Sequence, residues 1–273
     1  SKQLNTVILQ NFSWLFSAGS FAMLVLTAIV YFSPLGQVRI GGEGATPLLS
    51  KWRWFMVALC TTLAVGVLFW TTAEPLYHLY SPPSSLPIAA GSAAAKSFAL
   101  STMFLHWTLT PYAIYLVPSL VFALVFYNLR SHFSIGAMLQ PLLGAERVKR
   151  YAGLIDTLAM FALVAGMASS LGTGALTLSG GLSQYIGGET TPLRLGLIIA
   201  VIVFTFVASS ASGLQRGIVM LSSFNTWIML ALGAFVLVCG PSLYICSLGV
   251  ESLGVCLDTF FSRSLSTGAA SGD

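Results

Sequence analysis

The sequence predicts an all-α integral membrane protein, and two features of its composition support this fold class. Of its 273 residues, 56% are hydrophobic and only 7% are charged, whereas about a quarter of the residues of a soluble domain are charged. Six long segments are apolar, and Asp156 is the only acidic or basic residue within them. The Lys and Arg residues are spread over the loops and form no basic face, so nucleic acid is not an expected partner.

Each apolar segment predicts one transmembrane helix. A helix crosses the hydrocarbon with about 20 residues, because it satisfies its backbone N–H and C=O groups within itself. The segments cover residues 12–33, 54–73, 98–127, 152–178, 195–212 and 217–240.

Two polar positions mark helix ends in this prediction. The second segment is expected to end at Glu74 and Pro75, because proline cannot continue a helix and glutamate prefers water. Asp156 is expected one turn inside the fourth helix, where it would favour the N-terminal dipole and pair with Lys149 and Arg150.

The basic residues predict the orientation in the membrane. Alternate loops carry eight and four of the twelve Lys and Arg residues, and the richer side is expected to be cytoplasmic. Both termini then lie outside a multi-pass plasma-membrane protein. An outer N-terminus without an initiator Met or a signal peptide indicates a piece of a longer protein.

The tail, residues 241–273, differs from the six segments. Residues 243–265 mix apolar side chains with Glu251, Asp258 and Arg263, as expected of an amphipathic helix lying along the membrane interface. A seventh span is the competing interpretation.

Six short motifs then carry a resemblance to a known family. They are FSPLGQVRIGG (32–42), LFWTTAEPLYH (68–78), HWTLTPYAIY (106–115), SSLGTGAL (169–176), SGLQRGI (212–218) and GPSLYI (240–245). In this order and at these spacings, the chain resembles the betaine/choline/carnitine transporter family.

The resemblance implies a LeuT-like fold with two inverted repeats of five helices. Residues 12–33 would form a peripheral helix, residues 54–240 the first repeat, and residues 241–273 the interfacial helix and tail. The second repeat would lie outside this chain, and a homotrimer is allowed. The implied function is secondary active transport of glycine betaine, choline, carnitine or a similar osmolyte by alternating access.

The third segment offers residues for binding such a substrate. A trimethylammonium group has no N–H to donate, so aromatic faces are its natural partners. On a continuous helix, Trp107, Tyr112 and Tyr115 would fall at about 0°, 140° and 80°, on one broad face. By resemblance these three match the family's aromatic box, although Tyr112 stands where tryptophan is common. The competing interpretation is ordinary packing, which is also the role expected of the neighbouring His106, as a hydrogen-bonded residue.

The second segment departs from the family in the stretch that normally unwinds. Only Gly66 remains of three glycines, so the break there is expected to be mild. The resemblance assigns substrate contacts to Leu63 and Ala64, and sodium contacts to the backbone carbonyls of Cys60 and Leu63. No organic cofactor is expected, and coupling to sodium, to protons or to exchange is open.

Other classes of function have less support. An enzyme would need convergent ionisable groups, whereas the spans offer only Asp156 and His106, on different helices. The chain is therefore expected not to be an enzyme. A non-transporting membrane fragment or interaction subunit is the remaining alternative.

Overall fold

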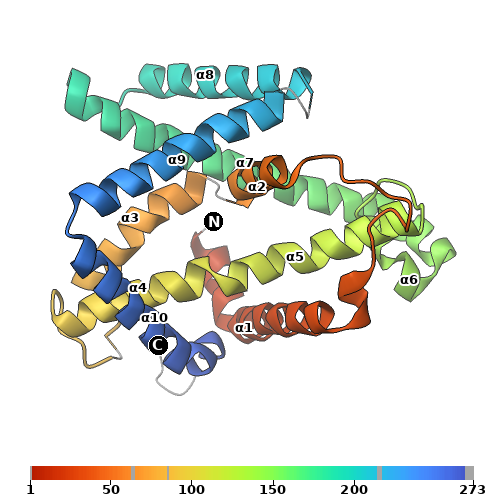
Figure 1. Ribbon diagram of the computed structural model, residues 1–273, viewed down its shortest axis with the longest axis horizontal. Helices are drawn as coiled ribbons and strands as arrows, with labels where there is room; N and C mark the ends of the chain where they lie inside the picture. Colours follow the sequence, from red (N-terminus) through yellow and green to blue (C-terminus); the bar gives the residue numbers. More distant parts are fainter. Residues whose placement is uncertain (1, 63–64, 85, 214–216, 268–273) are drawn as a thin grey trace. The chain divides into compact units, whose positions relative to one another are not determined.

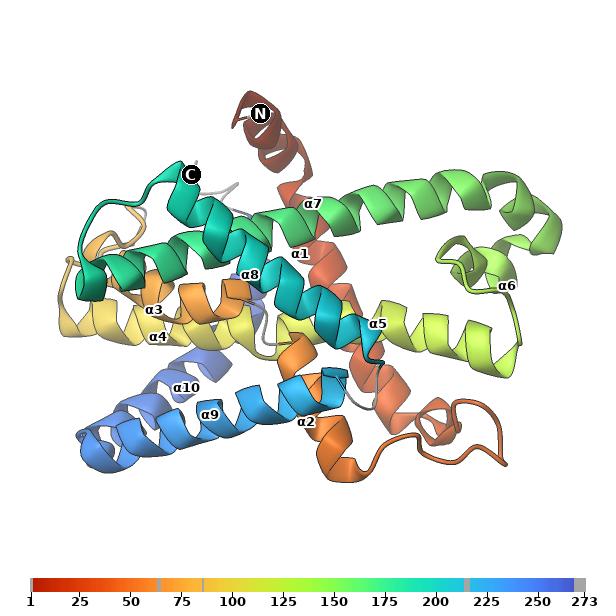
Figure 2. The same ribbon diagram turned by 90° about the horizontal axis from the view of Figure 1, so that it is seen from above.

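The computed structural model describes residues 2–62, 65–84, 86–213 and 217–267, and every regular element among them is a helix (Figures 1 and 2). The chain forms two compact units. Unit 1 contains residues 1–45, 74–156 and 246–273, and unit 2 contains residues 46–73 and 157–245.

Unit 1 is built on α4 (Ala93–Trp107) and α5 (Leu109–Ala123), which follow one another along nearly one line in both views (Figures 1 and 2). Helix α1 (Lys2–Phe32) packs against α5. A small apolar core joins α10 (Ser242–Ser264) to α4, with Leu105 of α4 buried against Cys256 and Phe260 of α10. This core fixes the end of α4 that carries the candidate site.

Arg263 adds a polar contact between α10 and α4. Its guanidinium group lies 3.0 Å from Ser101 Oγ, also donates to Thr102 Oγ1, and stands 4.9 Å from the centre of the Phe98 ring. Ser101 and Thr102 are both buried. The positive charge of Arg263 is thus held by α4, so it need not lie exposed at the membrane interface.

The connection from α5 to α7 (Ala145–Ile186) passes through three short helical turns. These are η2 (Leu124–Asn128), η3 (Gly136–Leu139) and α6 (Gln140–Leu143). Asp156 fastens this connection, because it accepts hydrogen bonds from Ser134 Oγ at 2.7 Å and from the Gly136 N–H at 2.8 Å. The predicted role of Asp156 is wrong: α7 begins at Ala145, so Asp156 lies about three turns inside it.

Unit 2 contains α2 (Lys51–Thr62), α8 (Pro192–Ala211), α9 (Val219–Cys239) and most of α7. Helices α2 and α9 pack together. Cys60 Sγ lies 3.3 Å from the carbonyl oxygen of Ser222 and 3.5 Å from Thr226 Oγ1, and the rings of Trp52 and Trp227 are 5.9 Å apart. These contacts join the end of α2 to the side of α9.

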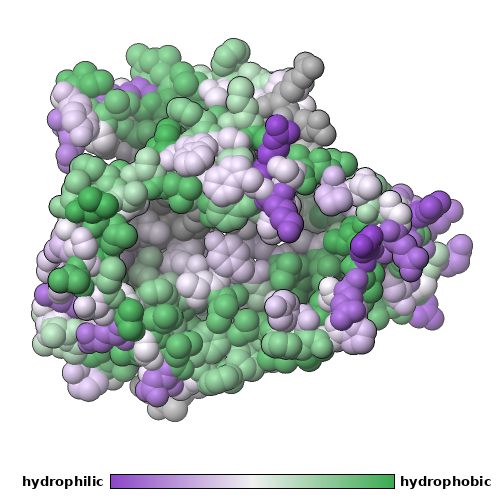
Figure 3. Space-filling model, in the orientation of Figure 1, coloured by the Kyte–Doolittle hydropathy of each residue, from purple (hydrophilic) through white to green (hydrophobic). Residues whose placement is uncertain are grey.

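Within the part of the chain that the structure describes, six helical stretches are long and apolar enough to cross a membrane. Five of them coincide with predicted segments, namely α1, α4 with α5 and η2, α7, α8 and α9. The sixth is α10, so the competing prediction of a seventh span stays open beside the interfacial one. Hydrophobic side chains cover much of the face in Figure 3, while hydrophilic ones gather mostly at the end that carries α6.

The predicted segment 54–73 falls on two helices, α2 and α3 (Val65–Tyr80). The predicted helix end at Glu74 and Pro75 is wrong, because α3 continues through Pro75 to Tyr80. Leu63 and Ala64, between α2 and α3, lie outside the described residues, as do residues 268–273 of the tail.

Candidate substrate site

The third apolar segment is interrupted directly after Trp107. Thr108 has backbone angles of φ −113° and ψ −108°, which fall outside the helical region, and α5 begins at Leu109. Pro111 explains the position of the break: it has no N–H for the Trp107 carbonyl, and its ring would collide with that carbonyl in a continuous helix. The Thr108 hydroxyl closes the end of α4 by donating to the Phe104 carbonyl.

This break changes the geometry of the predicted aromatic set. Trp107 is the last residue of α4, whereas Tyr112 and Tyr115 lie on α5, three residues apart and so on one face. The angles expected for one continuous helix therefore do not relate Trp107 to the two tyrosines. Trp107 is partly buried, while Tyr112 and Tyr115 are 39% and 59% exposed. Their rings are thus open to further contacts.

Glu74 is buried, with 8% of its surface exposed, and it holds the end of α4. The indole Nε1 of Trp107 donates to Glu74 Oε2 at 2.7 Å, and His106 Nδ1 lies 2.5 Å from Oε1. The carboxylate therefore takes hydrogen bonds from two consecutive residues of α4. The hydrogen-bonded role expected of His106 is confirmed, although its side chain is half-exposed.

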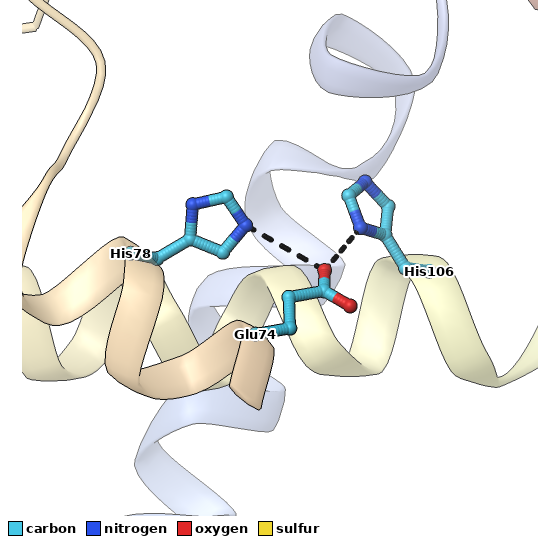
Figure 4. A group of neighbouring side chains, drawn as sticks. All are labelled: Glu74, His78 and His106. Carbon is cyan, nitrogen blue, oxygen red and sulfur yellow. Dashed lines mark hydrogen bonds and ion pairs between the residues drawn. The ribbon is translucent and has the colours of Figure 1, made fainter. Parts of the chain in front are cut away.

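His78 completes a polar cluster around Glu74. It lies one turn further along α3, with Nε2 3.5 Å from Glu74 Oε1. Figure 4 shows the two imidazole rings on opposite sides of the carboxylate. The ring of His78 also meets Phe98 edge to face, with centroids 5.6 Å apart. We call Glu74, His78, His106 and Trp107 the Glu74 cluster.

A groove of about 590 Å³ lies beside this cluster within unit 1. The lining residues come from α1, α4, α5 and α10: Leu15, Phe16, Ser17, Gly19, Ser20, Phe21, Met23, Leu105, His106, Thr110, Pro111, Ile114, Arg263 and Ser264. Tyr112 and Tyr115 are not part of this lining, so the groove and the predicted aromatic set are separate features.

The predicted sodium ligands lie in and beyond the end of α2. Cys60 belongs to the last turn of this helix. Residue 64, whose N–H would reach the Cys60 carbonyl oxygen in a continued helix, lies outside the described residues. Leu63, the other expected sodium contact, and Ala64, an expected substrate contact, lie outside the described residues.

The sequence prediction missed the Glu74 cluster. The i, i+4 spacing of Glu74 and His78 was a usable signal, because such residues share a helix face when the helix continues. Pro75 argued against that continuation. The meeting of Glu74 with His106 and Trp107 depends on the packing of two helices, which spacing alone does not give.

Comparison with known proteins defines the class of this membrane protein. A family model described as "BCCT, betaine/carnitine/choline family transporter" matches residues 1–273. An "uncharacterized transporter" of Mycobacterium tuberculosis is 31% identical over 92% of this chain and 43% of its own length. The "Ectoine/hydroxyectoine transporter" of Virgibacillus pantothenticus is 29% identical over 96% of this chain and 52% of its own length.

A shorter match is to "Glycine betaine transporter 1" of Vibrio parahaemolyticus, which is 34% identical over 64% of this chain and 34% of its own length. The chain belongs to the betaine/carnitine/choline transporter family, and the predicted resemblance is confirmed. It is a multi-pass protein of the plasma membrane, and its family consists of transporters and not of enzymes. The chain spans about half the length of the first curated relatives it matches.

Proposed function

We propose that this chain supplies half of a secondary active transporter, which carries a quaternary ammonium osmolyte by alternating access. Membership of the family over residues 1–273 carries the proposal. Glycine betaine and ectoine, the substrates in two relatives' names, are both small zwitterionic solutes, and glycine betaine is the first candidate here.

In the proposed fold, residues 54–240 form the first repeat of a LeuT-like transporter and a second repeat completes the site. Helices α2 and α3 take the place of the broken first helix of the repeat. Helix α1 is peripheral, and α10 links the repeats. Assembly as a homotrimer and coupling to sodium through the Cys60 carbonyl belong to the same proposal.

Trp107, Tyr112 and Tyr115 provide this half's share of the cation box. Trp107 supports the assignment because it is the last residue of α4, directly before the non-helical Thr108. Its N–H is already bonded to Glu74, so the ring faces remain as its means of recognition. An aromatic face contributes about 0.5 to 2 kcal/mol to binding a quaternary ammonium group.

Uptake of radiolabelled glycine betaine and choline into vesicles with the full-length protein tests the proposal. Saturable uptake is expected, and its dependence on an imposed sodium gradient decides the coupling ion. Trp107→Leu should raise KM about 2- to 30-fold, which corresponds to the loss of about 0.5 to 2 kcal/mol of cation–π attraction. Trp14→Leu is the matched control, because Trp14 is 60% exposed on the peripheral helix α1. Absence of saturable uptake of any zwitterionic solute would favour the non-transporting alternative.

A further inference from the structure

We propose that Glu74, His78 and His106 form a binding site for a transition-metal ion of the Zn²⁺ type. Each residue offers one ligand atom, and these atoms all lie within 4.8 Å of one another. The site adjoins Trp107, one of the aromatic residues proposed to bind substrate, but the test of metal binding needs no transport activity.

The donor set suits Zn²⁺. Two imidazole nitrogens and one carboxylate oxygen are a recurring set of three protein ligands, which leaves a fourth position for water. At metal–ligand distances of about 2.0–2.1 Å, tetrahedral ligand atoms stand about 3.3 Å apart. Glu74 Oε1 is 2.5 Å from His106 Nδ1 and 3.5 Å from His78 Nε2, and the two nitrogens lie within 4.8 Å of each other, so binding requires His106 to rotate away from Oε1 until the three atoms are equally spaced.

Two of the three ligands are mostly buried on one helix and the third is half-exposed on another, and this combination favours metal binding. Glu74 and His78 are one turn apart on α3, and their side chains are mostly buried. His106 comes from α4, and its side chain is 51% exposed, which gives it freedom to move and gives an ion access from outside the cluster. The counting of basic loop residues predicts that this end of α3 faces the outer side of the membrane.

Trp107 acts on the carboxylate as an outer partner. Its N–H holds Glu74 Oε2 and so leaves Oε1 directed at the two histidines. Hydrogen bonds of this kind orient metal-binding carboxylates, and their removal commonly weakens metal binding by about 10- to 100-fold. Binding of an ion at Oε1 would in turn fix α3 to the end of α4.

One nearby positive charge opposes the metal. Arg263 of α10 faces the same Phe98 ring as His78, and its charge acts on His78. Its guanidinium group is engaged by Ser101 and Thr102, so it does not occupy the carboxylate. The net charge of the three ligands, with neutral histidines, is negative, which favours a divalent cation.

Titration calorimetry of Zn²⁺ into purified, tag-free full-length protein tests the proposal. A Cys239→Ser/Cys246→Ser background removes the exposed thiols of this chain as competing ligands. His78→Ala and His106→Ala should each weaken Zn²⁺ binding at least about tenfold. His132→Ala, at an exposed loop position, should leave it unchanged.

Gel filtration of each variant separates lost binding from lost folding, and the half-exposed His106 is the variant expected to fold normally. Equal affinity in His106→Ala, His132→Ala and the parent protein overturns the proposal, as does absence of Zn²⁺ binding to the parent.

Discussion

The indole Nε1 of Trp107 donates a 2.7 Å hydrogen bond to Oε2 of Glu74, and so the last residue of α4 is tied to the middle of α3. The acceptor is buried, and the donor stands immediately before the break at Thr108. A charged acceptor makes this bond stronger than a neutral pair. The orientation of the Trp107 ring therefore depends on a residue of another helix.

We expect Glu74→Gln and Trp107→Phe to act non-additively on the KM for glycine betaine. Each change weakens or removes the same hydrogen bond, so the double variant should lose less than the two single losses combined. The coupling is expected at about 0.5 to 3 kcal/mol, the usual range for residues in contact. Uptake kinetics of the four proteins in the cycle measure it. Pairing Glu74→Gln with Trp14→Phe, an exposed ring on α1, should be additive; the same coupling there would contradict the interpretation.

Arg263 is expected to stabilise the packing of α10 on α4. Arg263→Ala removes a charged donor from Ser101 and Thr102 and a cation from the Phe98 ring, so the free energy of unfolding should fall by about 1.5 to 3 kcal/mol. Arg263→Lys should restore little, because lysine lacks the planar fork. Thermal unfolding in detergent measures both, with the exposed Lys149→Ala as control. An unchanged midpoint for Arg263→Ala would show that the contact contributes nothing.

The space around two glycines near Asp156 predicts opposite effects of replacing each with alanine. In Gly136→Ala the new Cβ would lie 3.0 Å from the Ala152 Cα, a backbone atom, so α7 or the loop must shift. We expect this variant to be destabilised by about 1 to 3 kcal/mol, similar to Asp156→Ala, which leaves the Gly136 N–H unpaired. Gly153→Ala, with open space around its Cβ in α7, should be neutral or more stable by up to about 1 kcal/mol. Equal midpoints for the two alanine variants would contradict the argument.

The long helices were predictable because their signal is local. Five of the six predicted segments became helices long enough to span a membrane, since apolar length alone decides this property. The motifs also predicted the family. Helix interruptions were harder to place: Pro75 is tolerated inside α3, whereas Pro111 accompanies the break at Thr108. Pro118 is likewise tolerated inside α5. The presence of proline alone therefore does not locate a helix break.

Site residues were predictable only where the residue type and its motif alone indicate a role. An aromatic ring can be proposed for a cation from its type and motif, as for Trp107, Tyr112 and Tyr115. The Glu74 cluster depends instead on two helices meeting, and Asp156 on a loop returning to α7. Both polar side chains were expected to point to water or to nearby lysine and arginine, because those are the partners visible along the sequence.

The two tyrosines of α5 allow recognition by ring faces to be separated from recognition by shape. Tyr115→Phe keeps the ring and should leave the KM for glycine betaine within about threefold of the parent, whereas Tyr115→Leu loses the ring and about 0.5 to 2 kcal/mol. Tyr112→Trp, which introduces the residue common in the family, should lower KM.

Competition by 3,3-dimethylbutyrate, which replaces the quaternary nitrogen by carbon, decides the physical cause. If ring faces attract the positive charge, Tyr115→Leu should weaken glycine betaine binding and leave the weak competition by the neutral tert-butyl group nearly unchanged. Equal losses for both ligands would assign Tyr115 to apolar packing around the methyl groups. Loss in Tyr115→Phe as large as in Tyr115→Leu would instead assign the hydroxyl to the site, because the ring is retained in that variant.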